Sequence, residues 1–222
     1  MCNRNNTDLT RGILSIAAFS LWTILVQTVD VQPAGAAGTG IGFASLNLWF
    51  HHLTGVHTPV YLLTDWLGLV PLSVCLLFAA FGCVQWIRRK DLRKVDTDIL
   101  LLGLYYLAVI LIYLLFEQFP VNYRPILIEG RMEASYPSST TLLVLSVMPT
   151  LSFQTDRRSA SVSVKGIVRA GTVIFSLLMV VGRLLCGVHW FTDIIGSVLL
   201  SLGLFSCYKG ILLHGRCYFG IT

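Results

Sequence analysis

Apolar blocks of similar length recur along the whole chain, and they limit its fold more than any other feature. The blocks cover residues 11–29, 66–87, 99–116, 137–153, 166–184 and 190–208. A helix needs about 20 apolar residues to cross the hydrocarbon core of a bilayer, and it satisfies its backbone hydrogen bonds internally. We therefore expect an all-α polytopic membrane protein, a six-transmembrane-helix bundle that forms a single membrane domain over residues 1–222.

Composition agrees with this fold class, because 55% of the residues are hydrophobic and only 12% are charged, against about 25% charged in soluble domains. The first block leaves two alternatives. Arg4 and Arg11 precede it and the segment 34–36 follows it, which allows a cleaved signal peptide, but its length favours a retained span. Pro149 in the fourth block predicts a kink or an early stop of that helix.

The placement of basic residues predicts the orientation. Most of the 16 lysines and arginines fall in the N-terminal segment, the second and fourth connections and the C-terminal tail. Cytoplasmic loops are enriched in these residues, so both termini are expected in the cytoplasm, with the chain in the plasma membrane. Arg124, Arg131 and Arg183 remain for the outer side. Three arginines there indicate an anion-binding site in preference to anchoring at headgroups.

The first connection, residues 30–65, contains no lysine or arginine and is predicted to be an outer loop. Its residues 35–42 are rich in glycine and alanine. The following segment 44–53 has the amphipathic pattern of a short helix that lies in the membrane interface.

Several other functions are disfavoured. The formal charge of +5 does not indicate nucleic-acid binding, because the basic residues lie at membrane edges, where topology explains them. The six cysteines are scattered without metal-type spacing, so neither a disulfide framework nor a metal site is expected. His51, His52 and His57 are too irregularly spaced to predict zinc binding.

The segment 182–193, GRLLCGVHWFTD, carries the strongest chemical pattern. In a helix, His189 and Asp193 would share one face. A carboxylate bonded to one imidazole nitrogen leaves the other nitrogen available as a nucleophile or base. Arg183, across a turn at Gly187, could bind phosphate oxygens in bidentate fashion. The alternative is that Asp193 only caps the last helix.

Two further patterns lie at the same predicted face. The segment 136–141, YPSSTT, opens the fourth span with hydroxyl groups. It is either a simple N-cap or, with the free N–H groups of the helix, an anion site. Arg124-Pro125 follows the third span, and the proline fixes the backbone beyond the arginine.

Together these patterns resemble the type 2 phosphatidic acid phosphatase and vanadium haloperoxidase superfamily. Arg124-Pro125 follows the third span, Pro137-Ser138 opens the fourth, and the pattern of Arg183, His189 and Asp193 enters the sixth. The order and spacing of the three patterns agree with the family over about residues 64–208, which we expect to form a phosphatase-like core.

The resemblance implies a covalent phosphohistidine mechanism in which His189 attacks phosphorus and Asp193 orients the ring. It implies that the phosphate oxygens are held by Arg124, Arg183, Ser138 and nearby backbone amides. Ser139, which departs from the family motif, is a further candidate for phosphate binding. The family needs no cofactor and no metal for this reaction.

The chain also departs from the family pattern. Glu117 stands where the family has lysine, Thr140 stands where it has the histidine that protonates the leaving group, and Gly182 replaces serine. Arg131 is a candidate for the missing positive charge. The candidates for the missing acid are Glu129, Glu133 and His57.

The leading hypothesis is a membrane lipid-phosphate phosphatase whose active site faces outward. It would hydrolyse a lipid phosphomonoester or pyrophosphate, with phosphatidic acid, phosphatidylglycerophosphate, polyprenyl phosphate and polyprenyl pyrophosphate as substrates to compare. The alternatives are a catalytically inactive relative that binds lipid phosphates, and a lipid phosphotransferase. The expected partners are lipid phosphates and membrane lipids, and the sequence predicts no oligomeric state.

Overall fold

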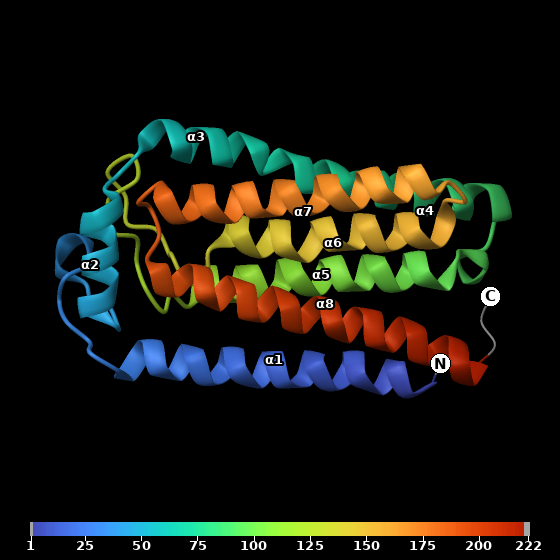
Figure 1. Cartoon of the computed structure of the whole chain (residues 1–222), viewed down its shortest axis with the longest axis horizontal. Coiled ribbons are helices and arrows are strands. Elements are labelled where there is room, and N and C mark those ends of the chain that lie inside the picture. The colour runs from blue at the N-terminus through green and yellow to red at the C-terminus, as the bar shows by residue number, and fades with distance from the viewer. Residues whose placement is uncertain (1, 220–222) are drawn as a thin grey trace.

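The computed structural model describes residues 2–219, with side chains for residues 7–214, and its regular structure is helical throughout. Long helices lie side by side along one axis (Figure 1). The helices are α1 (Cys2–Thr28), α2 (Ala44–Thr54), α3 (Thr58–Leu67), α4 (Leu69–Arg89), α5 (Thr97–Gln118), α6 (Ser139–Arg158), α7 (Val162–Leu185) and α8 (Phe191–Phe219), with short 3-10 turns η1 (Ala36–Gly38) and η2 (Leu92–Lys94). The prediction of an all-α fold is confirmed.

Five of the described helical segments are long and apolar enough to cross a membrane. They are Thr7–Thr28, Thr58–Arg89, Thr97–Gln118, Val162–Leu185 and Phe191–His214. Their outward side chains are apolar and exposed, as expected where lipid is the solvent. The prediction of a multi-pass membrane protein is therefore confirmed, and the number of six spans holds only approximately.

The exception is α6, which lies in the bundle between α4, α5, α7 and α8 and buries polar side chains as well as apolar ones. Thr141, Ser146, Thr150 and Gln154 are all buried on it. A helix surrounded by protein can carry such groups when they are hydrogen-bonded, as Thr150 is to Tyr106. The predicted early stop at Pro149 is wrong, because α6 continues through this proline to Arg158.

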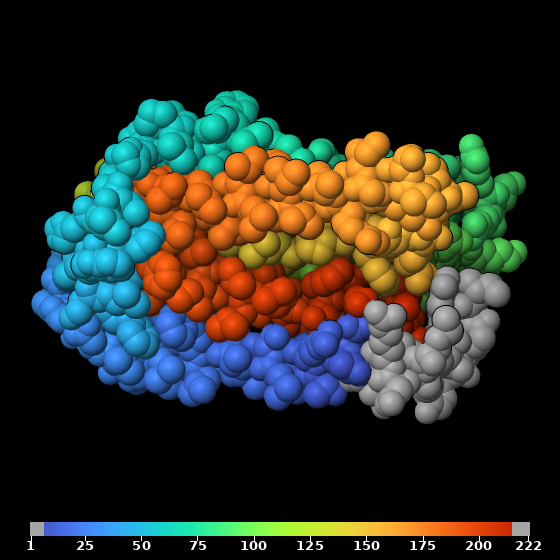
Figure 2. All heavy atoms as spheres, in the orientation of Figure 1, coloured from blue at the N-terminus to red at the C-terminus, as the bar shows by residue number. Residues whose placement is uncertain are grey.

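The first connection also differs from its prediction. The predicted interfacial helix at 44–53 is present as α2, which lies across one end of the bundle (Figure 2). The predicted loop 30–65, however, ends earlier, because α3 begins at Thr58 with Pro59 in its first turn and continues through Gly68 into α4. Proline is favoured at this position of a helix, since its missing N–H would have no helical partner.

The tightest helix contact joins α1 and α8, at opposite ends of the sequence. Small residues permit this approach. A Cβ atom added at Gly203 would lie 2.7 Å from Cγ1 of Ile16, and one added at Gly12 would lie 2.5 Å from Sγ of Cys207. The first apolar block is thus a packed helix of the bundle.

The two ends of the bundle differ in charge. The last turns of α4 and α6 carry Arg88, Arg89, Arg157 and Arg158. Asp98 at the start of α5 pairs with both arginines of α6, at 3.4 Å and 2.8 Å. The opposite end is formed by α2, the start of α3 and α6, and the connection between α7 and α8, and it holds the predicted site (Figure 1).

Candidate functional site

His189 lies in the short connection between α7 and α8, not in a helix as its spacing from Asp193 suggested. The turn depends on Gly187, whose φ of +74° places it in the left-handed region. A Cβ atom added there would lie 2.1 Å from the carbonyl oxygen of Gly55. This close approach holds the connection against the segment that precedes α3.

The imidazole of His189 is buried, and its hydrogen bond assigns the tautomer. Nδ1 lies 3.1 Å from the carbonyl oxygen of Ser135. A carbonyl only accepts, so Nδ1 carries the proton and Nε2 keeps its lone pair. Among the described residues, Nε2 has no hydrogen-bond partner. Burial lowers the pKa of His189 to about 4, and the positive charges of Arg124 and Arg183 act in the same direction, so the ring is neutral at neutral pH.

Asp193 caps α8, as one of the two alternatives predicted, and its carboxylate also lies beside His189. Its Oδ2 accepts a hydrogen bond of 2.9 Å from the backbone N–H of Trp190, which caps α8, and lies 3.8 Å from Nδ1 of His189. Its Oδ1 lies 3.3 Å from the amide nitrogen of Asn122, which donates to it. The carboxylate is therefore fixed by two donors beside the imidazole, at ion-pair distance from it.

Arg183, in the last turn of α7, is a buried guanidinium with unused donors. Its Nη2 donates to Oδ1 of Asp65 at 2.9 Å and to the hydroxyl of Thr140. Its Nε and Nη1 are buried without a hydrogen-bond partner among residues 7–214. Buried N–H groups of a charged side chain are costly to leave unpaired, so these two donors mark a place for an anion.

Arg124 presents a second guanidinium from the connection between α5 and α6. Its Nε lies 3.1 Å from Oε2 of Glu133, an ion pair without hydrogen-bond geometry, and its Nη1 is also unpaired within the described part of the chain. The ring of Tyr61 on α3 lies 6.0 Å from the guanidinium carbon of Arg124 and 5.2 Å from that of Arg183. One aromatic ring thus lies against both arginines.

The start of α6 adjoins these groups. Ser138 precedes the helix, and its hydroxyl donates to Thr141 at 3.1 Å instead of capping the backbone. Ser197 on α8 donates to the carbonyl oxygens of Ser138 and Asp193, at 3.0 Å each, so α6 and α8 begin side by side. Ser139 is half-buried at the same end.

The remaining predicted residues lie farther out. Glu129 and Arg131 occupy an exposed turn, where Arg131 exchanges two backbone hydrogen bonds with Ile128. Glu133 is bound to Arg124 as described. His57 is exposed, and its Nε2 donates to the carbonyl oxygen of Thr54 at 2.7 Å. The structure brings none of these four side chains to His189.

Four residues of the site were not predicted: Tyr61, Asp65, Asn122 and Ser135. Tyr61 and Asp65 lie four residues apart on α3, a helical spacing that could have been noticed, but they fell in the predicted loop. Asn122 and Ser135 are joined by a backbone hydrogen bond of 2.9 Å across the connection between α5 and α6. Their positions depend on the path of that connection, which no local pattern reveals.

An apolar groove of about 440 Å³ opens beside the arginines, between α3, α4, α5 and α6. Asp65, Ser139 and Thr140 line its polar end. Its walls are Leu69, Leu72, Val109, Ile110, Leu114 and Leu143. The site therefore combines unpaired guanidinium donors with an adjoining apolar surface. Across the described residues, no group of three His, Cys, Asp or Glu side chains could hold a metal ion.

Comparison with solved structures identifies the same architecture in a known enzyme. The fold is similar to the crystal structure of the first transmembrane PAP2 type phosphatidylglycerolphosphate phosphatase from Bacillus subtilis, with a TM-score of 0.61 and 19% identity. The match covers 91% of this chain and 96% of that one. No curated protein sequence matches this chain significantly.

The family comparison covers the helices that carry the site. The sequence model of the PAP2 superfamily matches residues 99–211, which run from α5 to α8 and include every predicted catalytic and arginine position. This match covers about half of the chain, and the chain belongs to the PAP2 superfamily.

Proposed function

We propose that this protein is a lipid-phosphate phosphatase that acts through a phosphohistidine on His189. One observation carries the proposal: the unpaired Nε2 of a buried, neutral imidazole lies in a site with two arginines whose N–H groups are also unpaired. A nucleophile beside preorganised cationic donors is the arrangement that phosphoryl transfer requires.

In the first step, Nε2 of His189 forms a bond to phosphorus while the bond between phosphorus and the leaving oxygen breaks. The ring becomes positively charged, and the carboxylate of Asp193, 3.8 Å from Nδ1, stabilises that charge. Arg124 and Arg183 bind the phosphoryl oxygens. Water then attacks phosphorus, the N–P bond breaks, and inorganic phosphate leaves with the histidine neutral again.

The leaving group determines which substrate this site suits. In the family pattern a histidine protonates the leaving oxygen, but Thr140 stands at that position and accepts a hydrogen bond from Arg183. A lipid alkoxide needs a proton as it leaves, whereas a lipid phosphate released from a pyrophosphate needs little assistance. The arrangement therefore favours polyprenyl pyrophosphate over phosphatidic acid, phosphatidylglycerophosphate and polyprenyl phosphate.

The proposed substrate binds with its phosphate at the arginines and a hydrocarbon chain in the groove between α3, α4, α5 and α6. We infer that the protein lies in the cell membrane. The arginine-rich end of the bundle faces the cytoplasm, since cytoplasmic loops are enriched in basic residues. The active site then faces the outer leaflet.

The test is phosphate release by the purified protein in mixed micelles, with the four lipids offered separately. His189→Ala and Arg183→Ala are expected to lower release by at least about a thousandfold. The first variant lacks the nucleophile, and the second lacks hydrogen-bond donors to the phosphoryl oxygens. His52→Ala, in the exposed part of α2, is the matched control and should keep full activity. Equal turnover by His189→Ala would exclude the phosphohistidine mechanism.

A non-catalytic lipid-phosphate-binding protein is the second candidate, because Thr140 and Asp65 already occupy one nitrogen of Arg183. Binding of all four lipids without phosphate release would favour it. Addition of an acceptor lipid alcohol to the same assay separates hydrolysis from phosphotransfer, since a transferase would form a new lipid phosphate instead of inorganic phosphate.

A further inference from the structure

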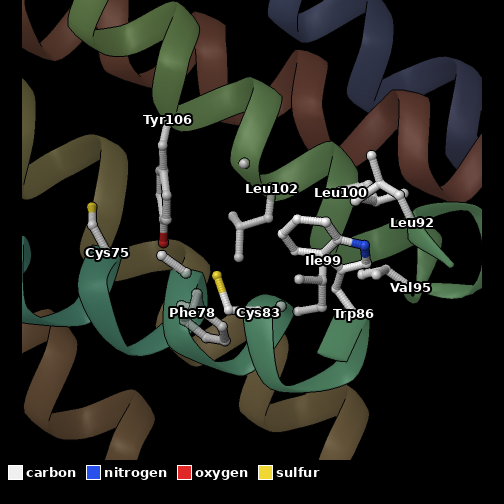
Figure 3. A pocket seen from close by; sticks show the side chains of 13 residues that line it. Cys75, Phe78, Cys83, Trp86, Leu92, Val95, Ile99, Leu100, Leu102 and Tyr106 are labelled. Atoms are coloured by element: carbon white, nitrogen blue, oxygen red, sulfur yellow. The ribbon is translucent and has the colours of Figure 1, made fainter. Parts of the chain in front are cut away.

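A second apolar groove, of about 290 Å³, lies between α4 and α5 toward the arginine-rich end of the bundle (Figure 3). Phe78, Trp86, Leu92, Val95, Ile99 and Leu102 supply much of its wall. Tyr106 and Cys75 lie at one end of the view, and Trp86, Leu92 and Val95 lie at the other. No residue of this groove belongs to the site around His189, so the groove needs a separate explanation.

Glycine residues line this groove, and the space beside one of them is open. Gly82 and Gly103 line it from the two facing helices. A Cβ atom added at Gly82 would lie 3.1 Å from Cγ2 of Ile99. A Cβ atom added at Gly103 would meet nothing within 4 Å, so the space beside it is empty and not filled by tight helix packing. Both helices expose apolar side chains to the surrounding bilayer, among them Leu76 at 70% and Leu104 at 63%. A hydrocarbon chain can therefore enter the groove directly from the membrane.

The mouth of the groove is basic. Arg88 lies two residues after Trp86 in the last turn of α4, and Arg93 and Lys94 lie in the chain between the lining residues Leu92 and Val95. No carboxylate in the described part of the chain forms an ion pair with these three side chains.

The neighbouring acids are already engaged. Asp96 pairs with Arg89 at 2.8 Å and with Arg158 at 3.3 Å. Asp98 pairs with the arginines of α6. Asp91 accepts a hydrogen bond from the backbone N–H of Arg93 at 2.9 Å. The three basic side chains at the mouth are thus available to an external anion.

Trp86 connects the apolar groove with its charged mouth. Its side chain lines the groove and is 51% exposed, one turn before the end of α4. Tryptophan in this position is typical of the boundary between hydrocarbon and headgroups. An apolar slot that ends in an interfacial tryptophan and unpaired cations matches an acidic phospholipid, with its chain in the slot and its phosphate at the mouth.

We propose that the groove between α4 and α5 is a binding site for one anionic phospholipid of the leaflet opposite the active site. One acyl chain lies against Phe78 and Leu102, and the headgroup phosphate binds Arg88, Arg93 and Lys94. The proposal is independent of the reaction at His189, because the two sites lie at opposite ends of the bundle and share no residue.

The test uses the fluorescence of Trp86 in phosphatidylcholine proteoliposomes. A small, equal fraction of brominated phosphatidylglycerol or brominated phosphatidylcholine is added, and the Trp86 signal is taken as the difference from a Trp86→Phe variant. If the groove binds an anionic lipid, brominated phosphatidylglycerol should quench Trp86 more strongly than brominated phosphatidylcholine. The preference should be about fivefold for each basic residue that binds the headgroup. Gly103→Leu fills the groove and should abolish the preference, and Arg93→Gln should lower it about fivefold.

Two matched variants separate a site from general effects. Gly171→Leu adds the same side chain on α7, where a Cβ atom also meets nothing within 4 Å. Lys165→Gln removes a charge at the same end of the bundle. Both should keep the preference. Equal quenching by the two lipids, a preference that survives Gly103→Leu, or a preference lost equally in Lys165→Gln would each overturn the proposal. Arg93→Gln keeps the test valid if Gly103→Leu does not fold.

Discussion

Arg183 donates a hydrogen bond from Nη2 to the hydroxyl of Thr140, the residue that replaces the histidine of the PAP2 pattern. The same nitrogen also binds Asp65 at 2.9 Å. We therefore propose that Thr140 positions the guanidinium of Arg183, in place of the proton donation that a histidine would provide here.

Thr140→Val should lower kcat/KM for phosphate release by about tenfold to a hundredfold, because a hydrogen bond to a charged group typically contributes about 1.5–3 kcal/mol. Thr140→Ser keeps the hydroxyl and should retain most of the activity. The measurement is steady-state phosphate release with the best substrate of the four lipids. Equal loss in both variants would indicate packing of the threonine methyl group as the cause.

Tyr61→Leu should lower kcat/KM by about fivefold to tenfold, because the ring lies against both Arg124 and Arg183 and each such contact contributes about 0.5–2 kcal/mol. The effect is expected mainly on KM, since the arginines bind the ground-state phosphate as well. Tyr61→Phe keeps the aromatic face and is the matched control. If it loses as much activity as Tyr61→Leu, the hydroxyl and not the ring is responsible.

The pH profile of kcat/KM should show an acid limb well below the ordinary imidazole range. Burial lowers the pKa of His189 to about 4, so the nucleophile stays neutral until the pH approaches that value. In the unfolded chain this histidine takes up its proton near pH 6.5. The free energy of unfolding should therefore fall as the pH drops from 6.5 toward 4. An acid limb centred near 6.5 would contradict the burial of the ring.

Gly203→Leu should destabilise the protein by about 2 kcal/mol or more, because a Cβ atom there would lie 2.7 Å from Ile16 and the α1–α8 contact would have to separate. The measurement is the thermal unfolding midpoint in detergent. Gly166→Leu on α7 is the control, since a Cβ atom at Gly166 meets nothing within 4 Å. A similar loss of stability in both variants would point to a general effect of the added side chain instead of packing against Ile16.

The sequence predicts the membrane class and most helices because lipid-facing helices must be apolar along their length. The sequence is least informative for segments that do not face lipid and so need not be apolar. The helix α6 is covered by neighbours, so its polar residues obscure its end at Arg158. The polar side chains of Tyr61 and Asp65 made the start of α3 resemble a loop.

The sequence also predicts only part of the site. The motifs identify Arg124, Ser138, Arg183, His189 and Asp193, and the structure gathers them at one end of the bundle. The partner that sets the imidazole tautomer is a main-chain carbonyl, that of Ser135. Any residue type offers a carbonyl, so only the path of the connection between α5 and α6 could reveal this contact.

Because α3 continues into α4, the length of this combined helix bears on the depth of the site in the membrane. The segment Thr58–Arg89 has 32 residues, which corresponds to a rod of about 48 Å, whereas the hydrocarbon core is about 30 Å thick. If the rod stands upright in the membrane, both of its ends extend beyond the hydrocarbon core, and the end beside the site carries Tyr61 and Asp65. A lipid phosphate already lies at this depth, so it can reach Arg183 by lateral diffusion without being lifted out of its leaflet. Catalytic rate should consequently depend on acyl-chain length in the host membrane, because a thicker bilayer would submerge the arginines.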